Sequence, residues 1–304
     1  MAKAFVSLVS FLLVCAPLVA DAQLHEMIGI RAQGMGGAFV AVADDATTTW
    51  WNPAGLASGA YFSAILEVDE GGGRGFAVAY PALGLSYYRL RIRQIRASGS
   101  TAGTTSGRQD QGSGGIGVPP SELVDVHQFG ATTGQSLGNH FVVASTLKLV
   151  RAQSDTVGDL DLGAMAKFGA LRVGLSVRNV RAPEFGADAT LMKIPRQAHT
   201  GVALTESTAG AINQLTVAFD ADLKTTTFEG RETRRVASGA EAWVLGRRIG
   251  IRGGAGTNTA ADTGSYFAGG LSVAFRSGMY LDAATTGGSD QAAHRWGVDL
   301  RLMF

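Results

Sequence analysis

The sequence has little charge and almost no cysteine. Only 17% of its 304 residues are charged, and the formal net charge is +1, so the chain carries no electrostatic footprint for nucleic acid. The single cysteine, Cys15, lies near the N-terminus, which leaves the remainder without disulfide or thiol chemistry. Beyond the first 22 residues, no segment approaches the roughly 20 consecutive apolar residues that a membrane-spanning helix needs. The five histidines are scattered without metal-ligand spacing, so we expect no metal or other cofactor.

The first 22 residues have the pattern of a secretory signal peptide. Lys3 provides the positive region, residues 4–19 form a short apolar stretch, and Ala20-Asp21-Ala22 is a small-residue cleavage site. Val14 precedes Cys15 where a lipoprotein signal would have a small residue, so lipid anchoring is not expected. The sequence therefore predicts a signal peptide at 1–22 and a mature chain exported through the inner membrane.

From residue 60 onward, about 14 segments read as β-strands with period-2 alternation. Many are close to the roughly 9–11 residues of a tilted strand that crosses a bilayer. The connections alternate in length, long at 96–120 and 181–196 but short at 81–82, 169, 246 and 276–277, as in bacterial barrels with short periplasmic turns. The predicted strands are 60–68, 74–80, 83–95, 121–131, 139–151, 159–168, 170–180, 197–206, 213–224, 232–244, 248–255, 264–275, 277–285 and 292–304.

The two faces of these strands differ in polarity. In the segment 170–180, Leu175 and Val177 alternate with Ser176 and Arg178. A charge facing lipid at the bilayer midplane costs about 2–4 kcal/mol for Arg or Lys, so the aliphatic face should meet lipid and the charged face the lumen. The fold class is therefore all-β: a transmembrane antiparallel β-barrel of about 14 strands over residues 60–304. The alternative is a soluble β-sandwich whose aliphatic faces form the interior. The number of strands and the alternation of long and short connections disfavour it.

Residues 29–58, GIRAQGMGGAFVAVADDATTTWWNPAGLAS, stand apart from the strand pattern. Glycines at 29, 34, 36 and 37 allow backbone to pass where a Cβ would clash. Asp44 or Asp45 is positioned to cap a brief helix, which Pro53 should end near Asn52.

This run resembles the N-terminal signature of the long-chain fatty-acid (FadL-type) transporter superfamily of the outer membrane, which includes PorV-like barrels of secretion systems. The resemblance implies that residues 23–59 form a hatch inside a 14-stranded barrel. It implies passive uptake of hydrophobic, fatty-acid-like molecules through a hatch-gated lumen. The chain is shorter than typical fatty-acid transporters, so a PorV-like structural or secretion-associated barrel that binds a protein partner is the alternative.

We expect the hatch to be seated or gated by a small set of residues. Asn52-Pro53-Ala54 has two interpretations, which are not exclusive. Its tight backbone fixes the plug and can kink to open a passage, or it is a folding determinant that seats the hatch through side-chain hydrogen bonds from Asn52. The further hatch candidates are Gly34, Gly36, Gly37, Asp44 and Asp45.

The candidates for ligand binding are aromatic and basic. Phe39, Trp50 and Trp51 are interpreted mainly as packing between hatch and wall, with a ligand pocket as the alternative. A further set, Arg89, Arg91 and Arg93, alternates on one face of a strand, and we place it in the lumen. There the arginines would either meet a carboxylate head group or pair with acidic residues such as Asp44 and Asp45.

The C-terminal strand ends on Phe304, in alternation with Trp296. This pattern resembles the signal that the barrel-assembly machinery recognises in outer-membrane proteins. Outer-membrane lipid and this machinery are thus expected partners. The segment Gly134-Gln135-Ser136-Leu137-Gly138 matches the nucleophile-elbow motif of hydrolases. It joins two predicted strands, however, and lacks the following helix that would present the serine. We therefore do not expect the protein to be an enzyme.

Overall fold

The computed structural model describes residues 27–95, 121–186, 192–228, 231–260, 264–288 and 294–304. The proposed signal peptide at 1–22 lies outside these residues. No helix in the described ranges is long and apolar enough to cross a membrane.

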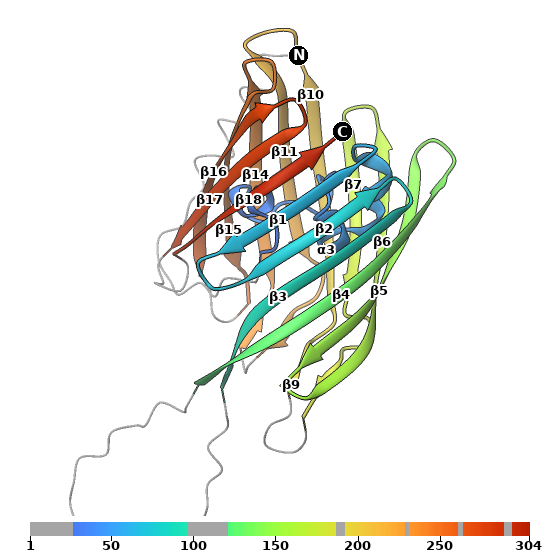
Figure 1. Cartoon of the computed structure of the whole chain (residues 1–304), viewed down its shortest axis with the longest axis vertical. Helices are drawn as coiled ribbons and strands as arrows, with labels where there is room; N and C mark the ends of the chain where they lie inside the picture. The colour runs from blue at the N-terminus through green and yellow to red at the C-terminus, as the bar shows by residue number, and fades with distance from the viewer. Residues whose placement is uncertain (1–26, 96–120, 187–191, 229–230, 261–263, 289–293) are drawn as a thin grey trace, which may run out of the picture.

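The wall of the molecule is one closed antiparallel barrel of 14 strands (Figure 1), as the strand pattern predicts. Neighbours along the chain pair with each other, and β1 closes the barrel on β18. Closure leaves no open sheet edge, which a bilayer would not tolerate. The barrel strands are β1 (Ser63–Asp69), β2 (Arg74–Tyr80), β3 (Leu83–Ile95), β4 (Ser121–Leu137), β5 (Phe141–Ala152), β6 (Asp155–Phe168), β7 (Leu171–Arg178), β10 (Gln197–Ser207), β11 (Ile212–Asp222), β14 (Arg235–Val244), β15 (Ile249–Asn258), β16 (Ser265–Arg276), β17 (Met279–Gly288) and β18 (Arg295–Met303).

Two small hairpins stand outside the barrel order. They are β8 (Glu184–Phe185) with β9 (Met192–Lys193), and β12 (Thr226–Phe228) with β13 (Arg231–Thr233). The first replaces part of the loop expected at 181–196. The second takes the residues expected to begin the strand at 232–244, so the barrel strand β14 begins at Arg235 instead.

On most strands the outer face of the wall is apolar and the inner face is polar, as alternation predicts. On β7, Leu175 is 43% exposed while the adjacent Ser176 is fully buried. On β11, Phe219 is 47% exposed while Asp220 is 1% exposed. Apolar side chains in contact with hydrocarbon and polar side chains in the lumen are the arrangement of a transmembrane barrel.

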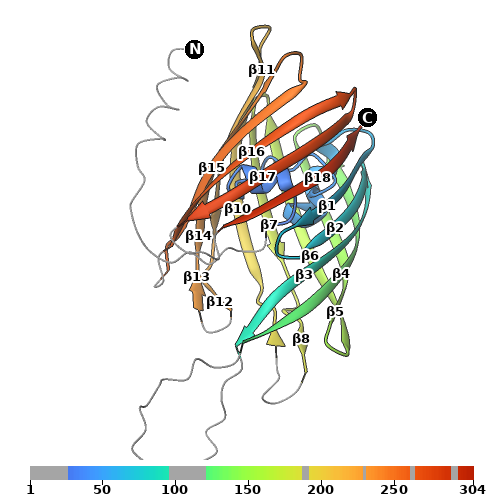
Figure 2. The same cartoon turned by 60° about the vertical axis from the view of Figure 1, so that its left-hand side comes forward.

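The two ends of the barrel differ in their connections (Figure 2). At one end, here called the turn end, the strands join through short turns at 81–82, 138–140, 169–170, 208–211, 245–248 and 277–278. The chain also enters and leaves the barrel there, because Phe62 and Phe304 exchange backbone hydrogen bonds of 3.0 and 2.9 Å. The opposite end, the loop end, carries the β8–β9 and β12–β13 hairpins, although its connections at 70–73 and 153–154 are short.

The described N-terminal residues, 27–59, lie within the ring of strands and are called the luminal segment (Figures 1 and 2). It contains α2 (Ile30–Gly34), α3 (Thr48–Trp51) and the 3-10 helix η1 (Pro53–Ser58). Helix α2 packs against β15 to β18, whereas α3 packs on β3 and β4, and η1 mainly on β4 to β6. The segment thus bridges two opposite halves of the wall.

Candidate functional site

Asn52 is the corner at which the luminal segment meets the wall. Its side chain is fully buried and makes three hydrogen bonds. The amide nitrogen Nδ2 donates to the carbonyl oxygen of Val40 at 3.0 Å and to that of Ala164, on β6, at 3.2 Å. The Oδ1 atom accepts from the backbone N–H of Ala54 at 3.1 Å, which caps η1. Asn52 therefore ties two parts of the luminal segment to each other and to the barrel.

Glycines allow the segment to approach the wall at backbone distance. A Cβ on Gly163 of β6 would lie 2.9 Å from both the Ala54 nitrogen and the Pro53 Cδ atom. Gly36 has a positive φ of 63°, and a Cβ there would lie 2.7 Å from the nitrogen of Ala255 on β15. Gly34 packs in the same way against Gly270 of β16. The glycines predicted from the sequence thus mark close contacts between the segment and the wall.

The preceding helix differs in detail from the sequence prediction. Helix α3 does end at Trp51, directly before Asn52 and Pro53. Its N-cap is Thr47 rather than an aspartate, and no side chain caps the helix. Asp45 instead accepts hydrogen bonds from the backbone and the hydroxyl of Thr47, at 3.0 and 2.5 Å, and so shapes the turn before the helix.

An ion-pair network holds α2 against β14 to β18. Arg31 binds Glu241 of β14 through two hydrogen bonds of 2.8 and 2.7 Å, and also contacts Asp44 and Asp45. Burial alone would lower the pKa of the Arg31 guanidinium, but the surrounding carboxylates, Asp44 and Glu241 foremost, raise it well above its usual value. Glu241 also accepts from Arg252 of β15 at 2.6 Å. Ion pairs with buried carboxylates therefore hold the luminal segment at Arg31.

The network continues along the wall away from α2. Arg252 lies 3.2 Å from Asp282 of β17, and Arg301 of β18 lies 2.7 Å from the same carboxylate. All three side chains are almost completely buried. This chain of paired charges fills the lumen beside β14 to β18.

Two further carboxylates of the wall bind backbone of the luminal segment. Asp220 of β11 accepts from the N–H groups of Phe39 and Val40, at 2.6 and 2.7 Å. Glu67 of β1 accepts from the N–H of Gly29 at 2.8 Å. These contacts satisfy buried donors that no helix or sheet pairs, so they complete the seating of the segment.

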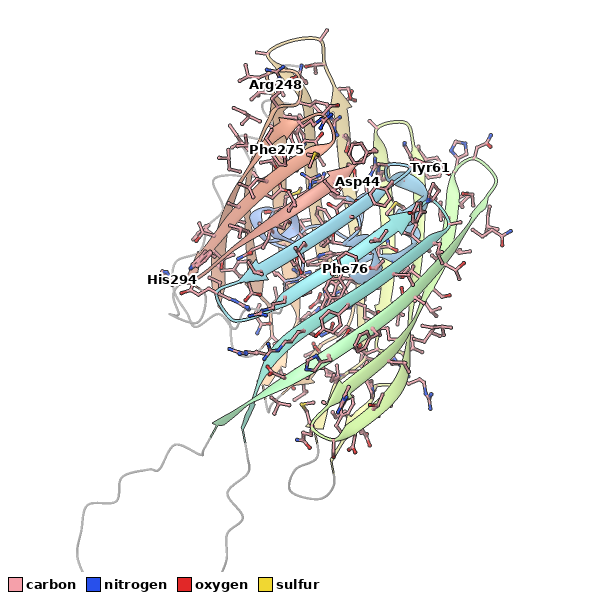
Figure 3. All side chains as sticks on the ribbon, in the orientation of Figure 1. Asp44, Tyr61, Phe76, Arg248, Phe275 and His294 are labelled. Atoms are coloured by element: carbon pink, nitrogen blue, oxygen red, sulfur yellow. The ribbon has the colours of Figure 1, made fainter. Side chains whose placement is uncertain are left out.

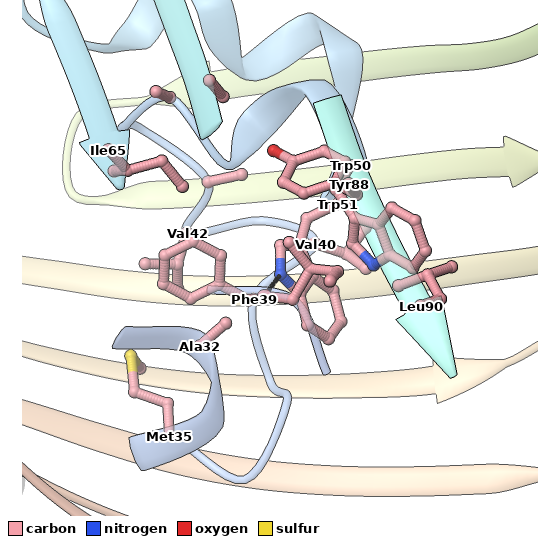
Figure 4. Close-up of a cluster of buried hydrophobic side chains, with 14 of the residues drawn as sticks. Ala32, Met35, Phe39, Val40, Val42, Trp50, Trp51, Ile65, Tyr88 and Leu90 are labelled. Carbon is pink, nitrogen blue, oxygen red and sulfur yellow. Dashed lines mark hydrogen bonds between the residues drawn. The ribbon is translucent and has the colours of Figure 1, made fainter. Parts of the chain in front are cut away.

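The aromatic residues Phe39, Trp50 and Trp51 are buried in one cluster (Figure 4). Phe39 and Trp51 pack edge to face with ring centres 6.1 Å apart. Trp50 packs edge to face on Tyr88 of β3 at 5.5 Å, and the guanidinium of Arg178 lies 3.6 Å above its ring. The contacts connect the segment to the wall on the side of β3 and β7.

The same cluster of buried apolar side chains continues toward the loop end of β3, β4 and β5. Three residues of the β8–β9 region belong to this part of the cluster: Phe185, Met192 and Ile194, which are 1%, 5% and 7% exposed. Together with the inward-facing wall residues they form the outer apolar cluster. Its wall residues are Leu90, Val124, Val126, Val150 and Ala152.

Acidic residues of β6 position the chain that leads into this hairpin. Asp161 accepts from the N–H of Asn179 at 2.7 Å, and Asp159 accepts from that of Arg181 at 3.0 Å. Lys148 of β5 balances both carboxylates at 2.8 and 3.2 Å. This arrangement was not predicted, because residues 181–196 were expected to be a long connection. Only the alternation of apolar residues near 192–194 indicates a hairpin there.

The placement of the arginine ladder in the lumen is wrong. On β3 the inward-facing residues are Tyr88 and Leu90, which are 2% and 4% exposed, so Arg89 and Arg91 face outward with Leu85. They pair with Asp125 of β4, at 2.5 and 3.3 Å, and not with Asp44 or Asp45. The side chain of Arg93 lies outside the described residues. The aromatic packing of Tyr88 on Trp50 decides which face of β3 points into the lumen.

The two residues of the expected assembly signal lie on the outer surface. Trp296 is 52% exposed near the loop end of β18, and Phe304 is 60% exposed at the turn end. The Phe304 ring stacks on Phe62 at 6.4 Å. Recognition of either residue by the assembly machinery stays a prediction.

Known structures share this architecture, although no family model and no curated protein matches the sequence. The "CymD monoaromatic hydrocarbon channel" matches with a TM-score of 0.60 and 13% identity, over 90% of this chain and 96% of that chain. The toluene transporter TbuX of Ralstonia pickettii matches with a TM-score of 0.59 and 12% identity, over 91% and 98%. A FadL homologue of Pseudomonas aeruginosa matches with a TM-score of 0.61 and 10% identity, over 90% and 97%. The chain has the fold of these three proteins.

Proposed function

We propose that this protein is an outer-membrane channel for passive uptake of small hydrophobic molecules. The observation that carries the proposal is the outer apolar cluster, which lies between the luminal segment and the loop end of the barrel. Apolar side chains there would take up a solute from the loop end by displacing the β8–β9 hairpin. A ligand of that kind is similar to those of two structural neighbours: CymD is a channel for monoaromatic hydrocarbons, and TbuX is a transporter of toluene.

Beyond the cluster, we propose that the luminal segment is a hatch that yields at its Asn52 corner. The Asn52 corner contacts the wall through neutral hydrogen bonds and adjoins β6. By contrast, Arg31 is held by ion pairs whose separation would leave charges buried. Residues of α3 and η1 would therefore move before α2 does.

Uptake in living cells tests the proposal. Vesicles of phospholipid are unsuitable for this assay because hydrophobic solutes cross them without a channel. A Gram-negative strain that lacks such channels would express the full chain, and entry of radiolabelled toluene and oleate would be compared with cells that carry an empty vector. The test variant is Val150→Gln, which puts an amide in the apolar cluster, and the control is Val143→Gln on the outward face of the same strand.

We expect uptake of at least one probe above the vector level, and several-fold slower uptake for Val150→Gln than for Val143→Gln at equal amounts of folded barrel. No uptake of either probe would refute the transport role. Equal uptake by the two variants would refute the assignment of the cluster.

A PorV-like partner-binding role is the second candidate, and the buried ion pairs beside β14 to β18 favour it, since they fill that half of the lumen. It predicts that the barrel purified from its native membrane retains a protein in native mass spectrometry and holds no fatty acid.

A further inference from the structure

We propose that the outer wall of β2 to β5 binds the phosphate group of a membrane lipid. Four outward-facing side chains of these adjacent strands are direct cross-strand partners. Arg74 pairs with Arg89, Arg89 with His127, and His127 with Arg151. They form a continuous cationic row across the sheet, near the loop end.

The row carries more positive charge than its neighbours neutralise. Arg91 adds a fourth guanidinium beside the row, and Asp125 is the carboxylate that Arg89 and Arg91 share. Arg74 and Arg151 are exposed and form no ion pair with any described residue. Four guanidinium groups therefore face one carboxylate. A phosphate oxygen accepts charge-assisted, bidentate hydrogen bonds from guanidinium, so an anionic headgroup fits this excess.

The next outward row toward the turn end is apolar. Phe76 pairs with Tyr87, Tyr87 with Phe129, and Phe129 with Leu149. Figure 3 shows Phe76 on the outer wall, where it is 46% exposed. The Tyr87 hydroxyl lies 2.8 Å from the Nδ1 atom of His127, so this tyrosine joins the two rows. Aromatic residues with a polar tip mark the level where hydrocarbon meets headgroups. The rows thus match a lipid whose chains lie on the aromatic row and whose phosphate lies on the arginines.

This arrangement is confined to one sector of the described wall. Away from the turn end, the outward faces of β6, β7, β10, β11 and β14 to β18 carry aliphatic, aromatic and small residues such as Leu162, Val202 and Leu281. A general preference for headgroups would spread cations over the outward faces of all these strands. The grouping on four adjacent strands instead indicates a site for individual lipid molecules.

Native mass spectrometry of the full chain in detergent tests the site with matched lipids. Dioleoyl phosphatidic acid is titrated against dioleoylglycerol, which has the same acyl chains without the phosphate, and inorganic phosphate is the third probe. The test variant is Arg74→Gln/Arg89→Gln/Arg151→Gln. The control removes three exposed arginines at the turn end, where Figure 3 shows Arg248, as Arg247→Gln/Arg248→Gln/Arg276→Gln.

We expect phosphatidic acid to bind the wild type more tightly than dioleoylglycerol does. Each arginine lost from the row should weaken the binding of phosphatidic acid roughly fivefold, so the triple variant should bind it on the order of 100-fold more weakly. The control triple variant should keep an affinity near that of the wild type. If the triple variant does not fold, Arg151→Gln alone serves, with a roughly fivefold loss expected for this exposed strand-end residue.

Three results would overturn the proposal. Equal binding of the two lipids would mean that the apolar row alone acts. Equal losses in the test and control triples would mean that net charge, not position, matters. Displacement of phosphatidic acid by submillimolar inorganic phosphate would mean that the arginines take a free anion. None of these depends on solute uptake, so the test is separate from that of the proposed channel.

Discussion

Replacing Asn52 by alanine should loosen half of the luminal segment and leave the barrel intact. The change removes three hydrogen bonds from a fully buried side chain and leaves the Ala54 N–H and the Val40 carbonyl without that partner. A buried polar group that loses its partner costs about 1–3 kcal/mol, so two such groups amount to about 3 kcal/mol. At 1.4 kcal/mol for each factor of ten, local opening should become on the order of 100-fold more frequent.

Hydrogen–deuterium exchange of the folded protein measures this opening directly, because it reports each peptide separately. Peptides covering 39–58 should exchange about 100-fold faster in Asn52→Ala than in the wild type. Peptides from β14 to β18 should keep their rates. The matched control is Asn213→Ala, which removes an asparagine that accepts from Gly246 and Arg247 at the turn end.

A second substitution separates the donor and acceptor roles of Asn52. Asn52→Asp keeps an oxygen for the Ala54 N–H but cannot donate to the carbonyls of Val40 and Ala164. We expect it to exchange at least as fast as Asn52→Ala, since a carboxylate would face two carbonyl oxygens. Wild-type exchange rates in both variants would refute the reasoning, because the three hydrogen bonds would then not hold the segment.

Three further substitutions test the seating and the assembly of the barrel. Glu241→Gln leaves Arg31 and Arg252 short of a buried counter-charge, so the free energy of unfolding should fall by about 3–5 kcal/mol, measured by urea denaturation. Gly163→Ala should reproduce the exchange of Asn52→Ala, whereas Gly253→Ala, where a Cβ meets nothing within 4 Å, should not. Phe304→Ala should lower the fraction of the protein that is folded in the outer membrane, scored by cell fractionation and heat-modifiable gel mobility, and unchanged assembly would argue against the C-terminal signal.

The wall could be predicted because its pattern repeats. Alternation fixes both the strand and its two faces, so β2 (Arg74–Tyr80) and β3 (Leu83–Ile95) agree with the predicted residues at both ends. The predicted ends of strands were less accurate where the end depends on the geometry of the turn. β4 continues to Leu137, six residues past the predicted end, because its backbone stays paired with β5 up to the turn.

The arginine ladder shows where the same reasoning fails. Alternation places Arg89 and Arg91 on one face but does not say which face is inside. The energetic rule used for that choice applies at the bilayer midplane, where a charge facing lipid costs about 2–4 kcal/mol, and this cost falls to about 0–1 kcal/mol near the interfaces. The arginines lie toward the loop end, where the rule is weak. The packing of Tyr88 on Trp50 decides the face, and that contact joins residues 38 positions apart.

The contacts of the luminal segment with distant strands were likewise beyond the sequence. Glu241 lies 210 residues from Arg31, and no local pattern links a single buried glutamate to that arginine. Asn52 could be singled out because a resemblance and a following proline marked it, but its partner Ala164 is known only from the fold.

For the hatch proposed above, the contacts of its two ends predict where opening would begin. Separating α2 from β14 to β18 leaves Arg31 and Glu241 buried without each other, which costs about 3–5 kcal/mol for a broken buried pair. Detaching the Asn52 corner from β6 breaks neutral hydrogen bonds at about 1–3 kcal/mol for each group left unpaired. The outer apolar cluster is built on β3, β4 and β5, and η1 packs against two of these strands, β4 and β5. The more weakly held end of the segment therefore lies beside the apolar cluster, so a solute in the cluster would meet the end that yields first.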